Sequence, residues 1–381
     1  MSLSAKRRAI LAKVESSYGV DSTPTGSANA LLVTALDVSP MEAETTERNL
    51  IRPFFGQAER LMTQIYSKAT FEIELAGHSG GIIGAMPKVD AVLRACGFAG
   101  TQKTIAISNL VQAAGTATAT VGAHNYKVGD KVLISGATPS AFNGTQTITA
   151  ITGTTFSFAI ASGTASPATG TIIMNSAYEY LPISEGIPSL TIYYAVDGVL
   201  HKLTGCKGTV SLELAVKNVP KLKFEFTGLN NAAVDAANPV IDLSQFTTPQ
   251  VANTQNTTNY SLLGYSGALE SLNLGLNNQV QYVTLIGKEY VDVLDRKVSG
   301  DMTFEAPTIA EKDFWTAAKN QTTGALNITH GSQNSNKVVI TCPKVLLDSP
   351  KYSEANNVMM MSCGVSVMPT TGNDEITLNF Q

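Results

Sequence analysis

The sequence predicts a mainly β protein, a β-sandwich or β-barrel with flanking helices. Short runs that alternate apolar and polar residues recur along the chain, as in residues 209–216 and 222–227. Charged residues make up 15% of the chain, below the ~25% of a typical soluble domain, while Thr, Ala, Gly, Asn and Ser are abundant. This composition is typical of antiparallel sheets and favours a surface largely covered by neighbouring copies.

An internal repeat indicates how the 381 residues, enough for two or three domains, are divided. Adding 136 to a residue number places four residues of the stretch 190–228 on identical residues near the C-terminus: Leu190 on Leu326, Ile192 on Ile328, Cys206 on Cys342 and Gly228 on Gly364. Residues 70–72 match residues 303–305 at an offset of 233. These matches predict two similar β-rich units, with chance similarity as the alternative.

The two offsets differ by 97 residues, and an inserted segment accounts for most of them. Asp130 is the one acidic residue between 101 and 174, and turn signals there recur about every 8 to 10 residues. We therefore expect a small all-β domain inserted in the first unit. The expected boundaries are 1–101 with 179–230 for the first unit, 102–178 for the inserted domain, 231–258 for a linker and 259–381 for the second unit.

In the first unit, residues 3–16 predict a short basic amphipathic helix, because Ile10, Leu11 and Val14 share one helical face. Such a helix would dock on its own domain or reach a partner. The remaining elements expected before the inserted domain are a strand over 31–38, a long connection over 39–66, an alternating strand over 68–75 and a helix over 87–98.

After the inserted domain, Asp197-Gly198 predicts a hairpin turn, followed by the alternating strands at 209–216 and 222–227. The second unit repeats this plan. Its expected elements are strands over 269–276 and 279–286, a strand around Thr303, a helix over 309–319, a hairpin across 331–336, and closing strands over 358–367 and 375–380.

Two groups of residues are candidates for function. The connection 39–66 is too apolar for a linker and would be stable only if its two Phe residues were buried, on their own domain or on a neighbouring molecule; its candidate contact residues are Glu42, Glu44, Arg48, Arg52, Phe54 and Phe55. Acidic residues also recur on the polar side of the predicted strands, where they belong either to a solvated sheet face or to the wall of a water-filled passage: Glu72, Glu74, Glu213 and Glu225.

Several other classes of protein are disfavoured. The net charge of -4 opposes a nucleic-acid grip, and the chain carries no phosphate-binding loop or dinucleotide fingerprint. The four cysteines lack metal spacing, so we expect buried free thiols. We expect no metal site or cofactor, because the histidines are scattered singly at His78, His124, His201 and His330. We also expect no membrane span and a chain made in the cytoplasm, because no apolar run approaches ~18 residues.

One motif imitates a catalytic site. Gly77-His78-Ser79-Gly80-Gly81 matches the nucleophile elbow of α/β-hydrolases and follows a predicted strand. However, that strand alternates with two Glu on its open side, and the glycines after Ser79 prevent an immediate helix. A Gly-rich turn is favoured. A serine esterase and a monomeric surface-binding or sugar-binding β protein stay open as alternative functions.

A resemblance to a known family rests on three stretches. The opening run Arg7-Arg8-Ala-Ile-Leu-Ala with Glu15-Ser-Ser-Tyr18-Gly19, the Thr70-Phe71-Glu72 strand, and the run from Pro343 to Tyr352 with Asp374-Glu375 resemble the major tail tube proteins of long-tailed bacteriophages. The segment 102–178, with Val128-Gly129-Asp130, Ile134-Ser135-Gly136 and Phe142-Asn143-Gly144, is similar to small β modules that decorate phage virion proteins.

The resemblance implies a β-sandwich flanked by a helix, six of which close into a ring. Rings stack into a tube through which DNA leaves, so the chain would be a structural virion component with other tail proteins at the tube ends. Two units per chain would make three chains per ring. The acidic strand positions would line the lumen so that DNA slides without binding. The connection 39–66 and its counterpart near 277–297 would reach the adjacent ring.

Overall fold

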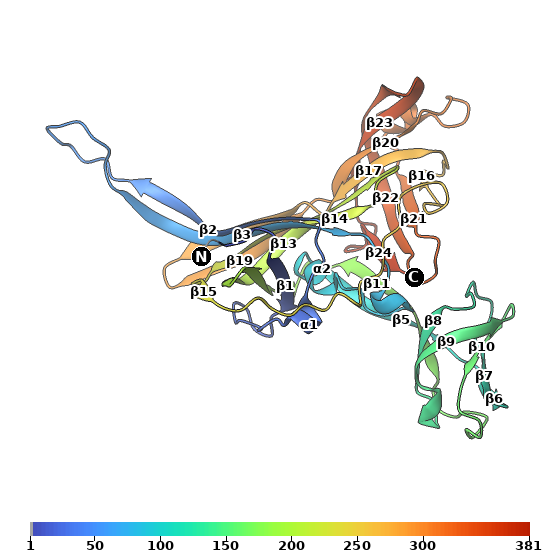
Figure 1. The fold of residues 1–381 in the computed structure, drawn as a ribbon. Helices are drawn as coiled ribbons and strands as arrows, with labels where there is room; N and C mark the ends of the chain where they lie inside the picture. The colour runs from blue at the N-terminus through green and yellow to red at the C-terminus, as the bar shows by residue number, and fades with distance from the viewer. Residues whose placement is uncertain (1–2) are drawn as a thin grey trace.

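A continuous antiparallel sheet runs through both halves of the chain in the computed structural model, which describes residues 3–381 (Figure 1). The fold is mainly β, as predicted. Eight strands form this main sheet, in the order β2 (Ala35–Glu47), β3 (Arg60–Glu74), β14 (Lys221–Asn230), β13 (Val199–Ala215), β17 (Leu269–Gly275), β20 (Ser299–Glu305), β23 (Val358–Val367) and β22 (Val338–Ala355).

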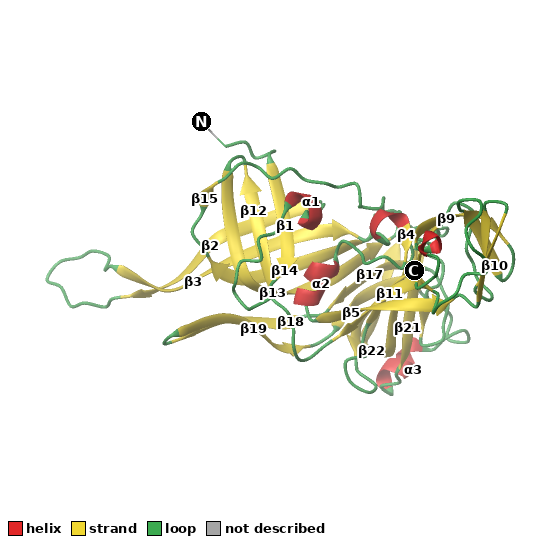
Figure 2. Cartoon of the chain, turned by 90° about the horizontal axis from the view of Figure 1, so that it is seen from below, coloured by secondary structure: helices red, strands yellow, loops and turns green. Residues whose placement is uncertain are grey.

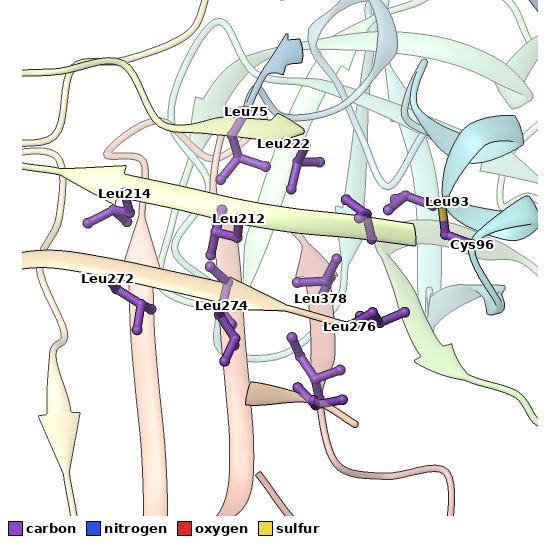
Figure 3. Close-up of a cluster of buried hydrophobic side chains, with 14 of the residues drawn as sticks. Leu75, Leu93, Cys96, Leu212, Leu214, Leu222, Leu272, Leu274, Leu276 and Leu378 are labelled. Carbon is purple, nitrogen blue, oxygen red and sulfur yellow. The ribbon is translucent and has the colours of Figure 1, made fainter. Parts of the chain in front are cut away.

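The two halves of the main sheet meet where β13 pairs with β17. In this ladder Leu212 lies opposite Leu274 and Leu214 lies opposite Leu272, and all four side chains are buried (Figure 3). Each buried leucine contributes about 1.5–3 kcal/mol relative to an exposed one. The junction is therefore held by apolar burial as well as by backbone hydrogen bonds, and one hydrophobic core continues from the first half into the second.

Further strands and two short helices cover the core side of the main sheet. At one end, β1 (Arg8–Val14) pairs with β12 (Leu190–Val196), which pairs with the first half of β13. At the other end the ladder runs through β5 (Phe98–Ala106), β11 (Ile173–Pro182), β24 (Thr377–Phe380), β22, β21 (Gly324–His330) and β16 (Ser261–Leu262). The helices α2 (Asp90–Ala95) and α3 (Phe314–Lys319) bury Leu93 and Phe314 in the core, and α1 (Gly26–Asn29) is a single turn.

Residues 107–172 form a side lobe with a hydrophobic core of its own (Figure 1). Its strands are β6 (Asn109–Ala113), β7 (Thr116–Thr120), β8 (Lys131–Ser135), β9 (Gly144–Ile151) and β10 (Thr155–Ala159). The lobe is attached by more than its two connecting strands, β5 and β11. Strand β4 (Ile82–Ile83) pairs with β8, and the Asn334 amide donates hydrogen bonds to the Asn125 carbonyl and to Asp130.

The N-terminal helix predicted over 3–16 is wrong, because residues 8–14 form the strand β1. Ile10 enters the main core, whereas Leu11 points to the opposite side and packs with Ala30 and Tyr193. In a strand, the adjacent residues Ile10 and Leu11 can both be buried because they point to opposite faces, and the backbone can pair with β12. A surface helix would have left part of the run exposed.

The long connection predicted over 39–66 is also wrong, because most of it is a β-hairpin. Strand β2 begins at Ala35 rather than Leu31 and continues to Glu47, and β3 begins at Arg60. The other two predicted helices, over 87–98 and 309–319, are confirmed but are shorter than predicted, six residues each. The region 231–258 is mostly irregular, with β15 (Val234–Asp235) as its short strand.

The remaining strand predictions are confirmed. Asp197 and Gly198 both adopt positive φ, 40° and 105°, which the tight hairpin between β12 and β13 requires. The hairpin across 331–336 connects β21 to β22. The strand predicted over 279–286 is β18 (Asn278–Leu285), which forms a separate two-stranded ribbon with β19 (Lys288–Arg296), a strand that was not predicted.

The matched residues of the internal repeat lie at comparable places in three of the four cases at offset 136. Leu190 pairs with Cys206, and Leu326 pairs with Cys342 in the same way. The fourth matched pair, Gly228 and Gly364, does not occupy equivalent positions. A Cβ on Gly228 would collide with the core side chain of Cys206, whereas Gly364 lies opposite Asp348 on the other face of the sheet.

A buried carboxylate fastens β1 to its neighbours. Glu15 is 8% exposed and accepts four hydrogen bonds, from the Ser189 and Thr191 hydroxyls at 2.6 and 2.9 Å and from the Gly19 and Gly205 amides, both at 2.8 Å. These bonds link the end of β1 to β12 and β13.

We predict that Glu15→Ala lowers the free energy of unfolding by about 3–5 kcal/mol, because it leaves several buried donors without an acceptor. Chemical denaturation followed by fluorescence measures the change. The exposed Glu185→Ala is the matched control and should change stability by less than about 0.5 kcal/mol. Equal effects of the two substitutions would contradict the role given to Glu15.

Candidate functional site

The main sheet has one face in the core and one polar face. Strand alternation turns Phe71, Leu212 and Met302 inward, where they are at most 3% exposed. On the polar face, one cross-strand row runs in register through seven strands: Glu74, Lys221, Glu213, Asn273, Asp301, Gly364 and Asp348. The polar face is therefore continuous across the β13–β17 junction.

The structure brings the four predicted acidic residues together on the polar face, but not as a purely acidic strip. The Lys221 ammonium lies 2.9 Å from Glu72, and Lys223 lies 3.0 Å from Glu225. The hydrogen bond from Lys221 lowers the pKa of Glu72. Lys221 is also the cross-strand neighbour of both Glu74 and Glu213.

Carboxylates nevertheless outnumber lysines on the polar face. By ladder register, the carboxylates belong to Asp37, Glu72, Glu74, Glu213, Glu225, Asp301, Glu305 and Asp348. The lysines are Lys68, Lys207, Lys221, Lys223 and Lys351. Sequence reasoning missed Asp301 and Asp348, although the alternation of their strands carried the necessary signal.

The main sheet ends in two open edges. Residues 35–39 of β2 pair only with β3, and residues 346–355 of β22 pair only with β23, within the part of the chain that the structure describes. Each edge therefore presents backbone N–H and C=O groups that no strand of this chain satisfies. Open edges of this kind are ready to pair with another copy.

Two hairpins extend past one end of the main sheet, which we call the arm end (Figure 2). The first arm is residues 39–66, and the second arm, β18 with β19, is residues 277–297. Gln64 accepts a hydrogen bond from Thr284 at 3.1 Å, and the rings of Tyr66 and Tyr282 lie 5.5 Å apart. The arms are thus held side by side at their bases.

All six residues predicted for contact lie on the first arm: Glu42, Glu44, Arg48, Arg52, Phe54 and Phe55. Ion pairs between Arg48 and Glu59 at 3.2 Å and between Arg60 and Glu47 at 2.7 Å connect its two strands. Its tip is apolar and uncovered, since Ile51 and Phe55 are fully exposed. Leu61 is also exposed, and Met41 and Met62 are further exposed apolar residues that sequence reasoning did not single out.

The Ser79 motif does not form a hydrolase site. The Ser79 hydroxyl donates to the Met86 carbonyl at 2.7 Å, and the adjacent His78 is turned into the core with its Nδ1 2.6 Å from the Ala85 carbonyl. Gly80 and Gly81 adopt φ of 62° and 65°, so the chain turns here as the Gly-rich reading predicts. Within residues 3–381 no cluster of three metal-ligating side chains occurs, and no helix has the length and apolarity to cross a bilayer.

Buried histidines instead anchor the irregular segment 245–257. The Thr247 hydroxyl donates to the His78 carbonyl at 2.6 Å. The imidazole of His330 lies 3.0 Å from the Thr257 hydroxyl and 3.1 Å from the Gln250 carbonyl. Burial lowers the pKa of His78 to about 4 and also lowers the pKa of His330. Both side chains are therefore neutral at pH 7.

Open sheet edges, uncovered apolar arms and a polar face without a catalytic cluster define a structural, self-associating class of β protein. Comparison with protein families then gives the family. The sequence model of the family described as phage tail tube protein matches residues 5–381, so the chain belongs to this family. No curated protein matches the sequence. The family is structural rather than enzymatic, and it makes the chain a component of the virion that assembles with other tail proteins.

We predict that acidification destabilises the protein through His78. The pKa of His78 is lower in the folded chain than in the unfolded chain. The contribution of neutral His78 to folding stability is therefore complete above pH 6.5 and is lost as the pH falls towards 4. That loss is about 3 kcal/mol at 1.36 kcal/mol per pH unit. In denaturation series from pH 7 to pH 4, the stability gap between the wild type and His78→Gln should narrow by about this amount.

Ser79→Ala removes the neighbouring side chain without removing a titrating group, so its stability should follow the wild-type pH profile at a constant offset. If the difference in unfolding free energy between the wild type and His78→Gln stays constant with pH, the pKa of His78 is the same in the folded and unfolded chains, which would contradict the prediction.

Proposed function

We propose that this chain forms closed rings that stack into the tail tube of a long-tailed phage, through which the genome leaves. The observation that carries the proposal is the eight-strand main sheet with an open edge on each side. Such a sheet can close only by pairing β22 of one copy with β2 of the next, which is a head-to-tail contact that generates a ring when the rotation closes. Closure removes both open edges.

The strand order supports two tail-tube units per chain and three chains per ring. Strands β2, β3, β14 and β13 form the first set, and β17, β20, β23 and β22 form the second. The matched tripeptides 70–72 and 303–305 lie on the second strand of each set. The β13–β17 ladder is then an internal example of the contact that β22 and β2 make between chains, and six units require three chains.

The polar face is proposed to line the lumen. Its opposite face is covered by the core and by the outer strands and helices, so a cylinder closed from this sheet carries the polar face inside. The excess of carboxylates, including Glu72, Glu74, Glu213 and Glu225, repels phosphate, and the interspersed Lys221 and Lys223 are engaged by carboxylates. DNA can then pass without being held.

The side lobe fits an inserted domain on the outside of the tube. It has its own core and lies apart from the main sheet (Figure 1). We retain the boundaries 1–101 with 179–230, 102–178, 231–258 and 259–381, noting that β5 and β11 cross from the first unit into the lobe.

Both arms are proposed to contact the adjacent ring. They extend along the strand direction beyond the arm end, and the first arm continues about 20 Å past the last β14 pairing at Tyr66 at ~3.3 Å per residue. Burial of the exposed tip in a neighbouring ring would remove an apolar patch from water.

Electron microscopy of concentrated purified protein tests the assembly. We predict rings and tubes whose end-on averages have threefold symmetry and whose rings contain three chains of 40.1 kDa. A small monodisperse monomer would contradict the proposal and favour a surface-binding or sugar-binding β protein. Sixfold rings of six chains would contradict the two-unit division.

We further predict that Glu74→Lys combined with Glu213→Lys makes assembled tubes retain double-stranded DNA at low salt. Each substitution removes a negative lumen charge and adds a positive one, and the binding should weaken steeply with added salt. A filter-binding titration of tubes with short duplex DNA measures retention. Glu185→Lys makes one such charge reversal at an exposed residue outside the strands of the main sheet and should leave retention at the wild-type level, whereas each single lumen substitution should raise it.

A further inference from the structure

A pocket opens at the end of the main sheet opposite the arms, which we call the far end. Its volume is about 290 Å³, and it lies between the C-terminal end of β13, the N-terminal end of β17 and the segment 252–260. Its apolar lining consists of Leu214, Val216, Ala252, Tyr260, Ala268 and Leu269. We call it the junction pocket, because it sits at the end of the β13–β17 ladder.

Strand register places the junction pocket and the first arm at opposite ends. The first arm leaves β3 near Tyr66, whereas Glu74 at the other end of β3 pairs with Lys221, which pairs with Glu213 beside the pocket. Rings stacked in one orientation therefore bring the arm end of one ring against the far end of the next. The arms of one ring and the junction pockets of the next therefore lie at the same boundary between rings.

The junction pocket is incomplete in the single chain. Tyr260 lines it and is 8% exposed. Val216, also in the lining, is 41% exposed. An open apolar pocket with a partly exposed valine in its lining indicates a missing apolar occupant.

The tip of the first arm supplies such an apolar group. Phe55 is fully exposed and makes no packing contact that would hold it against its own chain, whereas Phe54 is under the Arg52 guanidinium, 6.0 Å from its ring centroid. An apolar cavity of ~150 Å³ holds a benzene ring, so the junction pocket has room for one phenyl group.

A larger groove of about 750 Å³ beside Arg296 is a poorer acceptor. It lies at the start of β20 and the end of β23, which is the arm end of the sheet. Rings stacked in one orientation do not present the arms of a neighbour there. Its buried charges are also already paired, since Arg296 contacts Glu375 and Asn373.

We propose that Phe55 of one chain inserts into the junction pocket of a second copy in the adjacent ring. The inference rests on the proposed stacking of rings and adds the acceptor site and its partner residue. The pocket is formed by both halves of the chain, so the site exists only where β13 and β17 are paired.

Cysteine cross-linking in assembled tubes tests this contact. The four native cysteines are buried, so new surface cysteines react selectively. A variant with Phe55→Cys and Val216→Cys should give covalent multimers under mild oxidation. The matched control, Phe55→Cys with Leu294→Cys in the groove at the arm end, should give none.

The outcomes separate this inference from the proposed function. Tubes that form without a 55–216 cross-link, or that cross-link 55 to 294, overturn the inference and leave the tube intact. Wild-type protein that forms neither rings nor tubes overturns the proposed function and this inference with it.

Tube length gives an independent readout. Phe55→Ser should leave rings intact but shorten tubes at least tenfold in mean length by electron microscopy. Phe54→Ser removes an equal apolar group from the neighbouring position and should shorten them less than twofold. Equal shortening by the two variants would overturn the assignment of Phe55 as the inserted side chain.

Discussion

The backbone pairing of β13 with β17 is the constraint on which the rest of the structure depends. It joins two four-strand sets into one sheet, and the opposed leucines beneath it merge two cores into one. Because this junction fixes the register between the halves, the cross-strand rows of the polar face continue without a break. The outer edges of β2 and β22 lie at the two sides of this sheet and are not paired within the described residues.

Those edges and the arms are consistent with the low charge of the chain if copies pair as proposed. A single copy exposes backbone groups along two strands and an apolar arm tip, and both are unfavourable in water. As a member of the phage tail tube family the chain assembles with other tail proteins, and in the proposed ring neighbouring copies cover what one copy leaves open. The low charged fraction of 15% fits surfaces that are buried between copies.

Much of the fold could be predicted from the sequence, because strands such as β14 alternate cleanly between core and solvent. Strand β1 could not, since a run of four apolar residues has no alternation and its second face is covered by distant residues. The first arm was not predicted as a β-hairpin, because its mixture of charged and apolar residues does not alternate. Strand alternation predicted that the four glutamates lie on a polar face, but not that Lys221 lies beside them, because that depends on cross-strand register. The junction pocket depends on tertiary contacts that no local pattern encodes.

The most direct test of the central claim is a cryo-electron microscopy map of the assembled particle at side-chain resolution. The account predicts that residues 346–355 of one chain hydrogen-bond to residues 35–39 of the next, so that the main sheet continues around a threefold ring with its polar face inside. A ring in which these two edges are open to solvent, or in which copies meet only through the side lobes, would contradict it.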